Sequence, residues 1–481
     1  MKKNDFSRHP FLTTASASLG ALLTMGMGKI GFRNSSMKGS ITNGSGVLSV
    51  NPTSKNAAAE FQPVAFTQLP GIIAGMTLKE LRNDYKDRIF KQYLPFWDKG
   101  GYDNKLGGFM CELYDDGSVE SDEKDIWYQG RGIWVYSYLY NNFGKDEQFL
   151  KVAKKTRDFL IKNMYMGDGK WHETVNRQGQ PVASKLGQGS GKDIYGALFA
   201  AEGLIELYKA TGNKDDLEIA KTSIWSSVKA YENQGYEGVT VEGIDKKGLR
   251  TQGHSFIIIR TLTQLLSFHK DSELEELQSE HVGHLMNHFW NSEYRIVNED
   301  LFHDYTRIPG RETVMFTGHS LEALWMVLSE AIRKKDKQLF NTLKNRIRRL
   351  IEMNWDYVFN GLCTTNYYVF SSDGNCQGPT NEIKVMWAHT ELLIATMLIF
   401  ENTGEAWAKE WYERGREYCM KTMANTGNGV WRQAVDRFGK NKQRAGISNY
   451  RKDNYHQIRY QMMNLLSIER MIKNNGKISP M

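Results

Sequence analysis

Apolar residues recur at helical spacing along most of the chain. The first run places Leu78, Leu81, Tyr85 and Ile89 on one face, and this spacing is typical of a helix that buries one side. Six longer apolar runs follow, and each opens on a short polar segment. These segments occupy residues 129–134, 192–196, 252–256, 317–322, 387–391 and 454–459. The pattern predicts a chain built almost entirely of helices.

One polar residue in each segment marks an internal repeat. These six residues are Arg131, Asp193, His254, His319, His389 and His456. Their spacing of about 65 residues is enough for two helices and their loops. The repeat predicts an all-α fold, an (α/α)6 barrel of six helical hairpins whose inner helices begin at these positions. We expect a closed ring instead of an open solenoid, because only closure lets the polar residues face one another.

Glycine-led extended stretches precede four of the polar segments. They occupy residues 108–117, 169–179, 361–374 and 429–439. Alternating side chains that end in a glycine-containing turn are typical of short β-hairpins. We therefore expect such hairpins in the loops that lead to the inner helices.

The chain divides into three parts. Lys2, Lys3 and Arg8 precede an uncharged, moderately apolar stretch, which is the order of a secretory signal, so residues 1–32 are interpreted as an export signal. Residues 33–75 are rich in Asn, Ser, Gly and Ala and are interpreted as a low-complexity linker. Residues 76–475 are predicted to form the barrel, which would be the catalytic domain. An exported, periplasmic protein is expected; the alternative is a cytoplasmic protein with an unstructured N-terminal tail.

Charge and cysteine content narrow the possible partners. The net charge is +7, and residues 1–75 carry most of it, so the barrel lacks the basic surface that nucleic-acid binding needs. The N-terminal apolar stretch is interrupted by polar residues and predicts no stable membrane span. Four cysteines form no CxxC motif, although Cys363 and Cys376 could pair around a loop. A small molecule is the expected partner, and the sequence indicates no oligomeric state.

The polar segments contain residue types suited to proton transfer. His319 and Glu322 are three residues apart, as are His456 and Arg459, so each pair shares a helix face. An imidazole has an ordinary pKa of about 6.5 and exchanges protons near neutral pH. Several histidines and an arginine around one cavity favour removal of a proton next to a carbonyl group.

Two other readings compete with proton transfer by these histidines. His281, His284 and His288 share a helical face and could bind a metal ion, but few carboxylates are near them in sequence, so a packing or surface role is preferred and no metal is expected. Carboxylate-pair chemistry of a glycoside hydrolase stays open, since the same end of the ring carries Asp193, Glu322 and Glu391.

The polar segments resemble those of the N-acylglucosamine 2-epimerase family over about residues 85–470. The matching residues are Gln129-Gly130-Arg131 with Trp134, Gly318-His319 with Glu322, Lys384 with Trp387 and Glu391, and Tyr455-His456 with Arg459. The resemblance implies an (α/α)6 barrel and a cofactor-independent sugar isomerase. The family includes N-acylglucosamine 2-epimerases, cellobiose 2-epimerases and aldose–ketose isomerases.

The resemblance also implies roles for single residues. His319 and His456 take the places of the acid/base pair, and His254 takes the place of an additional catalytic histidine. Arg131 and Trp387 take the places of residues that hold the sugar. The other residues expected to bind substrate are Glu322, Glu391, His389, Arg459, Asp193 and Tyr195.

The predicted function is epimerisation of a reducing aldose at C2. N-acetylglucosamine/N-acetylmannosamine or a related mono- or disaccharide is the expected substrate, and a histidine removes the C2 proton of the open-chain aldehyde. Return of the proton to C1 would give a ketose, so an aldose–ketose isomerase is the nearest alternative. A glycoside hydrolase on the same barrel and a sugar-binding protein without catalysis are alternatives from other classes.

Overall fold

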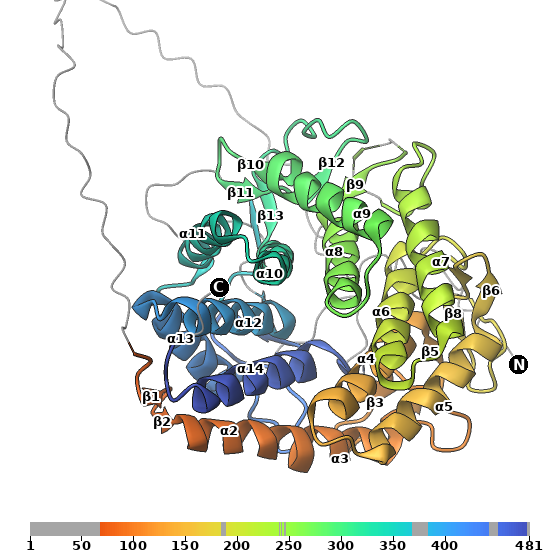
Figure 1. The fold of residues 1–481 in the computed structure, drawn as a ribbon, viewed down its shortest axis with the longest axis horizontal. Coiled ribbons are helices and arrows are strands. Elements are labelled where there is room, and N and C mark those ends of the chain that lie inside the picture. The colour runs from red at the N-terminus through yellow and green to blue at the C-terminus, as the bar shows by residue number, and fades with distance from the viewer. Residues whose placement is uncertain are drawn as a thin grey trace, which may run out of the picture.

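The computed structural model describes residues 68–183, 189–239, 241, 243–244, 247–367, 383–441 and 451–478. The predicted export signal and residues 33–67 of the predicted linker lie outside these residues. Within them, the chain forms two concentric rings of helices (Figure 1). The predicted all-α barrel is confirmed.

Six helices of the described chain make the inner ring, and each contacts the next in order. The last of these helices also contacts the first, which closes the ring. At this junction Asn454 Nδ2 donates to the backbone carbonyl of Tyr128 over 3.0 Å. The inner helices are α4 (Ile126–Asn142), α6 (Ile194–Thr211), α8 (Gln252–Leu266), α10 (Thr317–Lys334), α12 (Met386–Thr403) and α14 (His456–Lys473).

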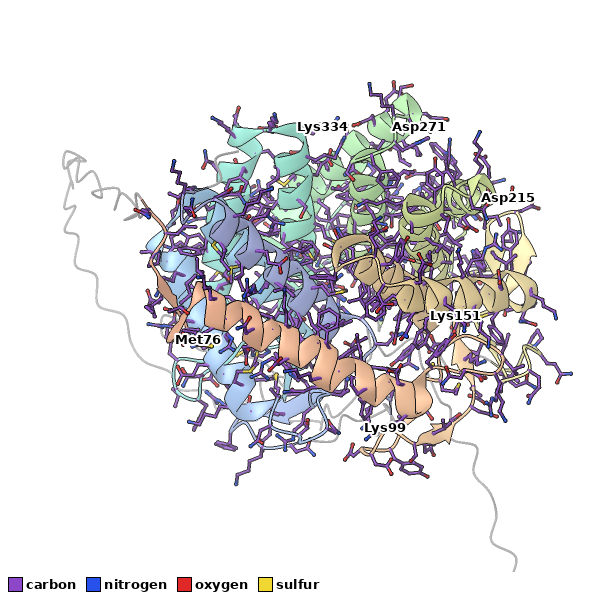
Figure 2. All side chains as sticks on the ribbon, turned by 60° about the horizontal axis from the view of Figure 1, so that its bottom comes forward. Met76, Lys99, Lys151, Asp215, Asp271 and Lys334 are labelled. Carbon is purple, nitrogen blue, oxygen red and sulfur yellow. The ribbon has the colours of Figure 1, made fainter. Side chains whose placement is uncertain are left out.

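The outer helices alternate with the inner ones along the chain and cover them from outside. A continuous rod runs across α14 and is made of α2 (Leu78–Lys86), η1 (Asp87–Tyr93), α3 (Leu94–Phe96) and η2 (Trp97–Gly101) (Figure 2). The other outer helices are α5 (Glu147–Asn163), α7 (Lys214–Tyr231), α9 (Ser272–Gly283) with η3 (His284–Phe289), α11 (Lys337–Asn354) and α13 (Ala406–Thr422).

Burial separates the two rings. Every residue of α8 is buried, because an inner helix has neighbours on all sides. The outer helix α11 buries one stripe that includes Phe340, Leu343 and Ile347. A helical period of apolar residues is therefore clear in the outer helices. The inner helices are nearly continuous apolar runs with polar residues near their N-terminal ends.

Glycines allow α4 and α6 to approach closely. A Cβ atom on Gly130 would lie 2.4 Å from the backbone carbonyl of Phe199, and one on Gly203 would lie 2.4 Å from the carbonyl oxygen of Gly130. Any larger residue at either position would push the two helices apart. Gly130 thereby brings the N-terminal part of α4, which carries Arg131, against α6.

Most strands that precede inner helices pair with a strand from the next repeat. The antiparallel pairs are β5 (Lys124–Asp125) with β8 (Thr174–Val175), β9 (Arg250–Thr251) with β12 (Asp300–Leu301), β13 (Val314–Phe316) with β14 (Thr365–Tyr367), and β15 (Ile383–Val385) with β16 (Ala434–Asp436). These pairs tie consecutive repeats together at the end where the inner helices begin.

The remaining strands form local hairpins. They are β1 (Ile72–Ile73) with β2 (Met76–Thr77), β3 (Glu112–Leu113) with β4 (Val119–Ser121), β6 (Tyr165–Gly167) with β7 (Lys170–Trp171), and β10 (Trp290–Asn291) with β11 (Ile296–Val297). The predicted hairpin at 108–117 is thus extended to residue 121. The stretches at 169–179 and 429–439 turn at Gly179 and Gly439, which have positive φ, but their strands β8 and β16 pair mainly with other repeats. Residues 368–374 lie outside the described chain.

Two ion clusters of the same design fix the strands before α4 and α12. In each, a fully buried lysine lies 3.0 Å from an aspartate that also accepts from an arginine Nε. Lys384 is therefore a buried structural residue and not a group that faces the cavity. The clusters consist of Asp103, Lys124 and Arg177, and of Asp356, Lys384 and Arg437.

The packed chain begins earlier than the predicted boundary at residue 76. Leu69 and Ile73 are buried, and the Leu69 N–H donates to the Gly476 carbonyl over 2.8 Å. The prediction of a linker is wrong for residues 69–75, because their apolar side chains are too few to show a helical period yet complete the core beside α13 and α14.

No helix in the described parts has the length and apolar character to cross a membrane.

The described cysteines differ in their state. Cys363 is disulfide-bonded, whereas Cys111 and Cys419 are free and buried. Cys376, the other half of the pair considered from the sequence, lies outside the described residues.

Candidate functional site

A cavity of about 840 Å³, including its open mouth, lies at the N-terminal ends of the inner helices. All six inner helices contribute to its wall. Its aromatic lining consists of Trp127, Tyr128, Tyr195, Phe199, Phe256 and Trp387. Its charged and polar lining consists of Arg131, Glu322, Gln433, Arg451, Asp453 and His456. Aromatic faces with a few polar groups suit a sugar, which has apolar ring faces and hydroxyl edges.

His456 is the first residue of α14 and faces the cavity. Its Nδ1 lies 3.1 Å from Glu391 Oε1 and 3.2 Å from Arg459 Nη2. In the tautomer whose Nδ1–H donates to Glu391, the Nε2 lone pair is the proton acceptor. Burial lowers the pKa of His456 to about 3, with Arg459 and Arg131 acting in the same direction against Asp453 and Glu322. The imidazole is therefore neutral at neutral pH, as a general base requires.

His319, on α10, is buried and has the opposite tendency. Burial, the largest influence, lowers its pKa, but the carboxylate of Glu299, 2.6 Å from Nδ1, acts with Glu322 and Asp300 to raise the pKa of His319 above its ordinary value. Its Nε2 has no hydrogen-bond partner among the described residues. Such a histidine is suited to give a proton.

The indole of Trp387 contacts both imidazoles. Its centroid lies 5.1 Å from that of His319 and 5.8 Å from that of His456. A Cβ atom on Gly318 would lie 2.2 Å from the indole, so the glycine before His319 is what admits this ring. His319 does not itself line the cavity but lies directly behind Trp387 and Phe256.

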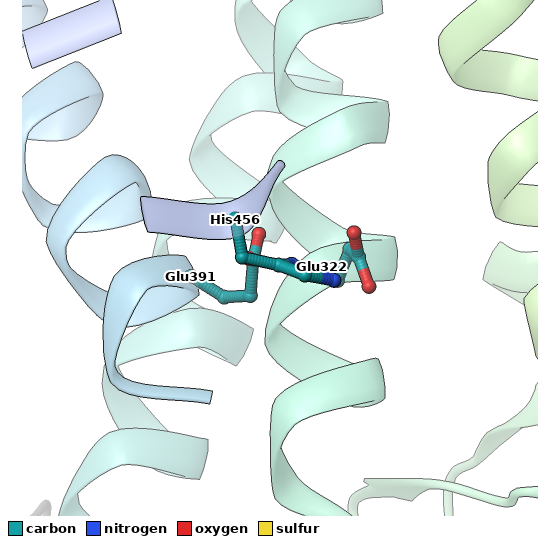
Figure 3. A group of neighbouring side chains, drawn as sticks. All are labelled: Glu322, Glu391 and His456. Atoms are coloured by element: carbon teal, nitrogen blue, oxygen red, sulfur yellow. The ribbon is translucent and has the colours of Figure 1, made fainter. Parts of the chain in front are cut away.

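Glu322, Glu391 and His456 converge from α10, α12 and α14 (Figure 3). Their ligand atoms lie within 4.8 Å of one another, a spacing that a metal ion could bridge. However, Nη2 of the fully buried Arg459 lies 2.7 Å from both carboxylates. A guanidinium in this position neutralises the pair and would repel a metal cation, so the group is best described as an ion-pair network.

Arg131 presents its guanidinium to three aromatic rings. Its central carbon lies 4.0 Å from the Phe199 centroid, 4.9 Å from that of Tyr455 and 5.4 Å from that of Trp127. No ion pair to a carboxylate is found for Arg131 within the described chain, and its buried Nε has no hydrogen-bond partner there. A cation held in this way is suited to an oxygen that gains negative charge.

Tyr195 of α6 lines the cavity, whereas His254 of α8 does not line it and packs against Tyr195. Their ring centroids are 4.7 Å apart, and Gly253 leaves room for the Tyr195 hydroxyl, which would lie 1.9 Å from a Cβ atom there. Neither ring nitrogen of His254 has a hydrogen-bond partner in the described residues. Burial lowers the pKa of His254 to about 3, so this ring is neutral.

Four residues predicted to bind substrate do not line the cavity. His389 accepts the Leu362 N–H at Nε2, lies 2.8 Å from the Val385 carbonyl through Nδ1, and stacks on Tyr418 of the outer helix α13. Asp193 does not line the cavity; its Oδ2 accepts from Trp127 Nε1 over 2.6 Å, and burial raises its pKa to about 7. Glu391 and Arg459 also lie outside the lining and support Glu322 and His456 from behind.

The sequence did not point to several residues of the site. Glu299 lies in the loop between β11 and β12, where neither the helical spacing of apolar residues nor the internal repeat singles it out. Asp453 accepts the Gln457 N–H over 3.0 Å near the start of α14, and an acidic residue before an apolar run is a capping signal that could have revealed it. The other cavity residues not predicted include Tyr128, Phe199, Phe256, Gln433 and Arg451.

The histidine row of α9 and η3 is used in packing. His281 Nδ1 lies 3.2 Å from Ser255 Oγ, and His284 Nε2 lies 2.8 Å from Tyr305 Oη. His288 stacks on the Tyr305 ring with centroids 4.3 Å apart. These contacts agree with the packing role preferred from the sequence.

Comparison with known proteins places this barrel among sugar epimerases. The family model described as N-acylglucosamine 2-epimerase (GlcNAc 2-epimerase) matches residues 107–459. The N-acylglucosamine 2-epimerase of Mus musculus is 24% identical over 379 residues, which cover 75% of this chain and 87% of that protein. The cellobiose 2-epimerase of Dictyoglomus turgidum is 23% identical over 340 residues, covering 68% of this chain and 83% of that protein.

A solved structure has the same fold. The cellobiose 2-epimerase from Spirochaeta thermophila DSM 6192 superimposes with a TM-score of 0.67 at 17% identity, over 82% of this chain and 98% of that one. The fold and the cavity thus define an (α/α)6-barrel enzyme that acts on sugars. The chain belongs to the N-acylglucosamine 2-epimerase family, since the family model matches well over half of it. This confirms the resemblance seen in the sequence and places the chain among the isomerases.

Proposed function

We propose that this protein interconverts a reducing aldose and its C2 epimer by proton transfer between the sugar and two histidines. The observation that carries the proposal is the pair His319 and His456, which contact one indole ring but have pKa values moved in opposite directions. A base and an acid that differ in this way at one pH can remove a proton from one face of a carbon and return one to the other.

The reaction starts from the open-chain aldehyde, whose carbonyl makes the C2 proton acidic. Neutral His456 takes this proton at Nε2, and the electrons move into the C1–C2 bond to give an enediolate. Arg131, which lies in the same cavity without a carboxylate partner among the described residues, stabilises the oxygen that becomes negative.

Protonated His319 then donates from Nε2 to C2 on the opposite face. His319 ends neutral and His456 ends protonated, so exchange with solvent restores the starting forms. The Trp387 ring lines the cavity and lies against His319, which does not line it, so this proton transfer requires the indole to move aside.

An aldose–ketose isomerase would use the same residues but return the proton to C1. A glycoside hydrolase would need two carboxyl groups on either side of the sugar. The ion-pair network argues against that class, because Glu322 and Glu391 both bind Arg459 Nη2. Asp193, the third carboxylate considered, does not line the cavity and accepts a hydrogen bond from Trp127, which does.

Product analysis separates these possibilities. The protein is incubated with a panel of reducing mono- and disaccharides, and the anomeric region of the proton NMR spectrum is followed. New signals of the C2 epimer support the proposal, signals of a ketose support the isomerase, and release of a new reducing end from a glycoside supports the hydrolase. A panel without any epimer product would contradict the proposal.

Export to the periplasm is proposed from the basic and apolar order of residues 1–32. The disulfide at Cys363 supports this, because such bonds persist in oxidising compartments. Cell fractionation with N-terminal sequencing of the mature protein tests it. A periplasmic, shortened chain is expected, and a cytoplasmic chain that begins at Met1 would contradict it.

A further inference from the structure

Glu299 is held in the site by the helix next to it. It lies in the loop between β11 and β12 with 7% of its side chain exposed. Its carbonyl oxygen accepts the Gln252 N–H over 3.0 Å, and its Oε2 accepts Gln252 Nε2 over 2.8 Å. Because Gln252 is the first residue of α8, both the backbone and the carboxylate of Glu299 are fixed relative to the inner ring.

The other carboxylate oxygen is directed at His319. The distance from Glu299 Oε1 to His319 Nδ1 is 2.6 Å, which is short for a charge-assisted hydrogen bond. The bond occupies Nδ1 and leaves Nε2, which has no partner in the described chain, as the one nitrogen available for proton exchange. The rings of Phe256, Phe316 and Trp387 pack around the imidazole, so apolar contact and the bond to Glu299 set its orientation.

We propose that Glu299 is a positioning residue for His319: it accepts the Nδ1–H, fixes the imidazole and keeps it protonated, so that Nε2–H is presented as the acid. The inference rests on the proposed function for its catalytic meaning. The hydrogen bond and its effect on His319 are physical properties of the protein that can be measured without substrate.

Other charged groups near His319 do not replace Glu299. Glu322 of α10 and Asp300 of β12 also favour the charged imidazole, but Glu322 is bound to Arg459. Burial and the neighbouring Glu299 raise the pKa of Asp300 to about 7, and Arg311 lies 3.7 Å from it. Glu299 is therefore the carboxylate in direct contact with the ring.

The direct test measures the protonation of His319 by NMR on protein labelled with ¹⁵N-histidine. The His319 signal is assigned by its loss in His319→Asn. In Glu299→Gln, which keeps the shape but removes the charge, we expect the pKa of His319 to fall by about one to three units. The matched control is Glu293→Gln, an exposed residue paired with Arg307, which should leave the His319 signal unchanged.

Activity provides the second readout. If the protonated form of His319 is the acid, kcat/KM in the wild type falls as pH rises through its raised pKa, and Glu299→Gln should move this alkaline limb to lower pH. Glu299→Asp keeps the charge but withdraws it by one methylene, so it should give a smaller shift in the same direction and also serves if Glu299→Gln does not fold.

The outcomes separate the two claims. An unchanged His319 pKa in a folded Glu299→Gln or Glu299→Asp protein would overturn the positioning role, whatever the activity. A lowered His319 pKa in a protein that epimerises no sugar would support the positioning of His319 and contradict the proposed function. A lowered pKa together with a shifted alkaline limb would support both.

Discussion

Arg459 and Glu391 form a fully buried ion pair, with 2.7 Å between Nη2 and Oε1. The same Oε1 lies 3.1 Å from Nδ1 of His456. Arg459 does not line the cavity, and its position is suited to fixing the carboxylate that orients the proposed base. Arg459 is one of the residues that resemble the family, yet it supports the cavity wall from behind.

Loss of the Arg459 charge should destabilise the fold. In Arg459→Met, two carboxylates stay buried without their cation, and we expect the free energy of unfolding to fall by about 3–5 kcal/mol. Urea denaturation measures the change. Arg414→Met, which removes an exposed pair with Glu410, is the matched control and should change stability little. Equal effects of the two substitutions would contradict the role given to Arg459.

Loss of the Arg131 charge should affect catalysis more than stability. Its guanidinium contacts aromatic rings and no carboxylate in the described residues, so Arg131→Gln breaks no ion pair there. Without the cation that stabilises the enediolate, kcat should fall by about 100- to 1,000-fold. Steady-state kinetics and a thermal melt test this. Near-normal kcat in the folded variant would exclude Arg131 from transition-state stabilisation.

The pH dependence of kcat/KM should be asymmetric. Because the pKa of His456 is lowered to about 3, its neutral form persists throughout mildly acidic solution, and the acid side of the profile should be nearly flat. Because the pKa of His319 is raised, activity should decline on the alkaline side as that ring loses its proton. A profile limited on the acid side near pH 6.5 would show that the base is an ordinary, solvent-exposed histidine.

His389 should contribute to the pH dependence of stability and not to catalysis. Burial lowers its pKa to about 4, so between pH 4 and the unfolded value of about 6.5 the unfolded chain binds one proton more than the folded chain. Stability from this group is therefore present above pH 6.5 and lost as pH falls toward 4, with a slope of about 1.4 kcal/mol per pH unit.

His389→Gln removes this contribution. Urea denaturation between pH 4.5 and 6.5 should show a slope reduced by about one proton, while kcat at neutral pH stays within about tenfold of the wild type. His456→Ala is the contrasting variant, which should lose activity. Loss of activity in a folded His389→Gln protein would place His389 in the catalytic site after all.

Much of the fold could be predicted because the repeat has a simple physical origin. Each hairpin must place polar residues near the N-terminal end of an inner helix at one end of the ring, so the series Arg131, Asp193, His254, His319, His389 and His456 recurs about every 65 residues. The small residue before the histidine also has a steric reason, since Gly253 and Gly318 each admit an aromatic ring from a neighbouring helix.

Site residues could not be predicted from the sequence where their place depends on the exact position within a helix or on strand pairing between repeats. His319 is the third residue of α10, whereas His389 is the fourth of α12. One residue turns a helix by about 100°, and His389 consequently points to the outer ring. Glu299 could not be found because it lies between repeats, and β12, which follows it, pairs with β9 before α8. That contact is set by tertiary structure alone.

The most direct test of the account is solvent exchange at C2. The protein is incubated in D₂O with N-acetylglucosamine, glucose, mannose or cellobiose, and the recovered sugar and its epimer are examined by NMR and mass spectrometry. The account predicts one deuterium at C2 for at least one of these sugars, with the exchange abolished in His456→Ala and in His319→Ala proteins that remain folded. Absence of deuterium from C2 of every sugar, or undiminished exchange in both variants, would contradict it.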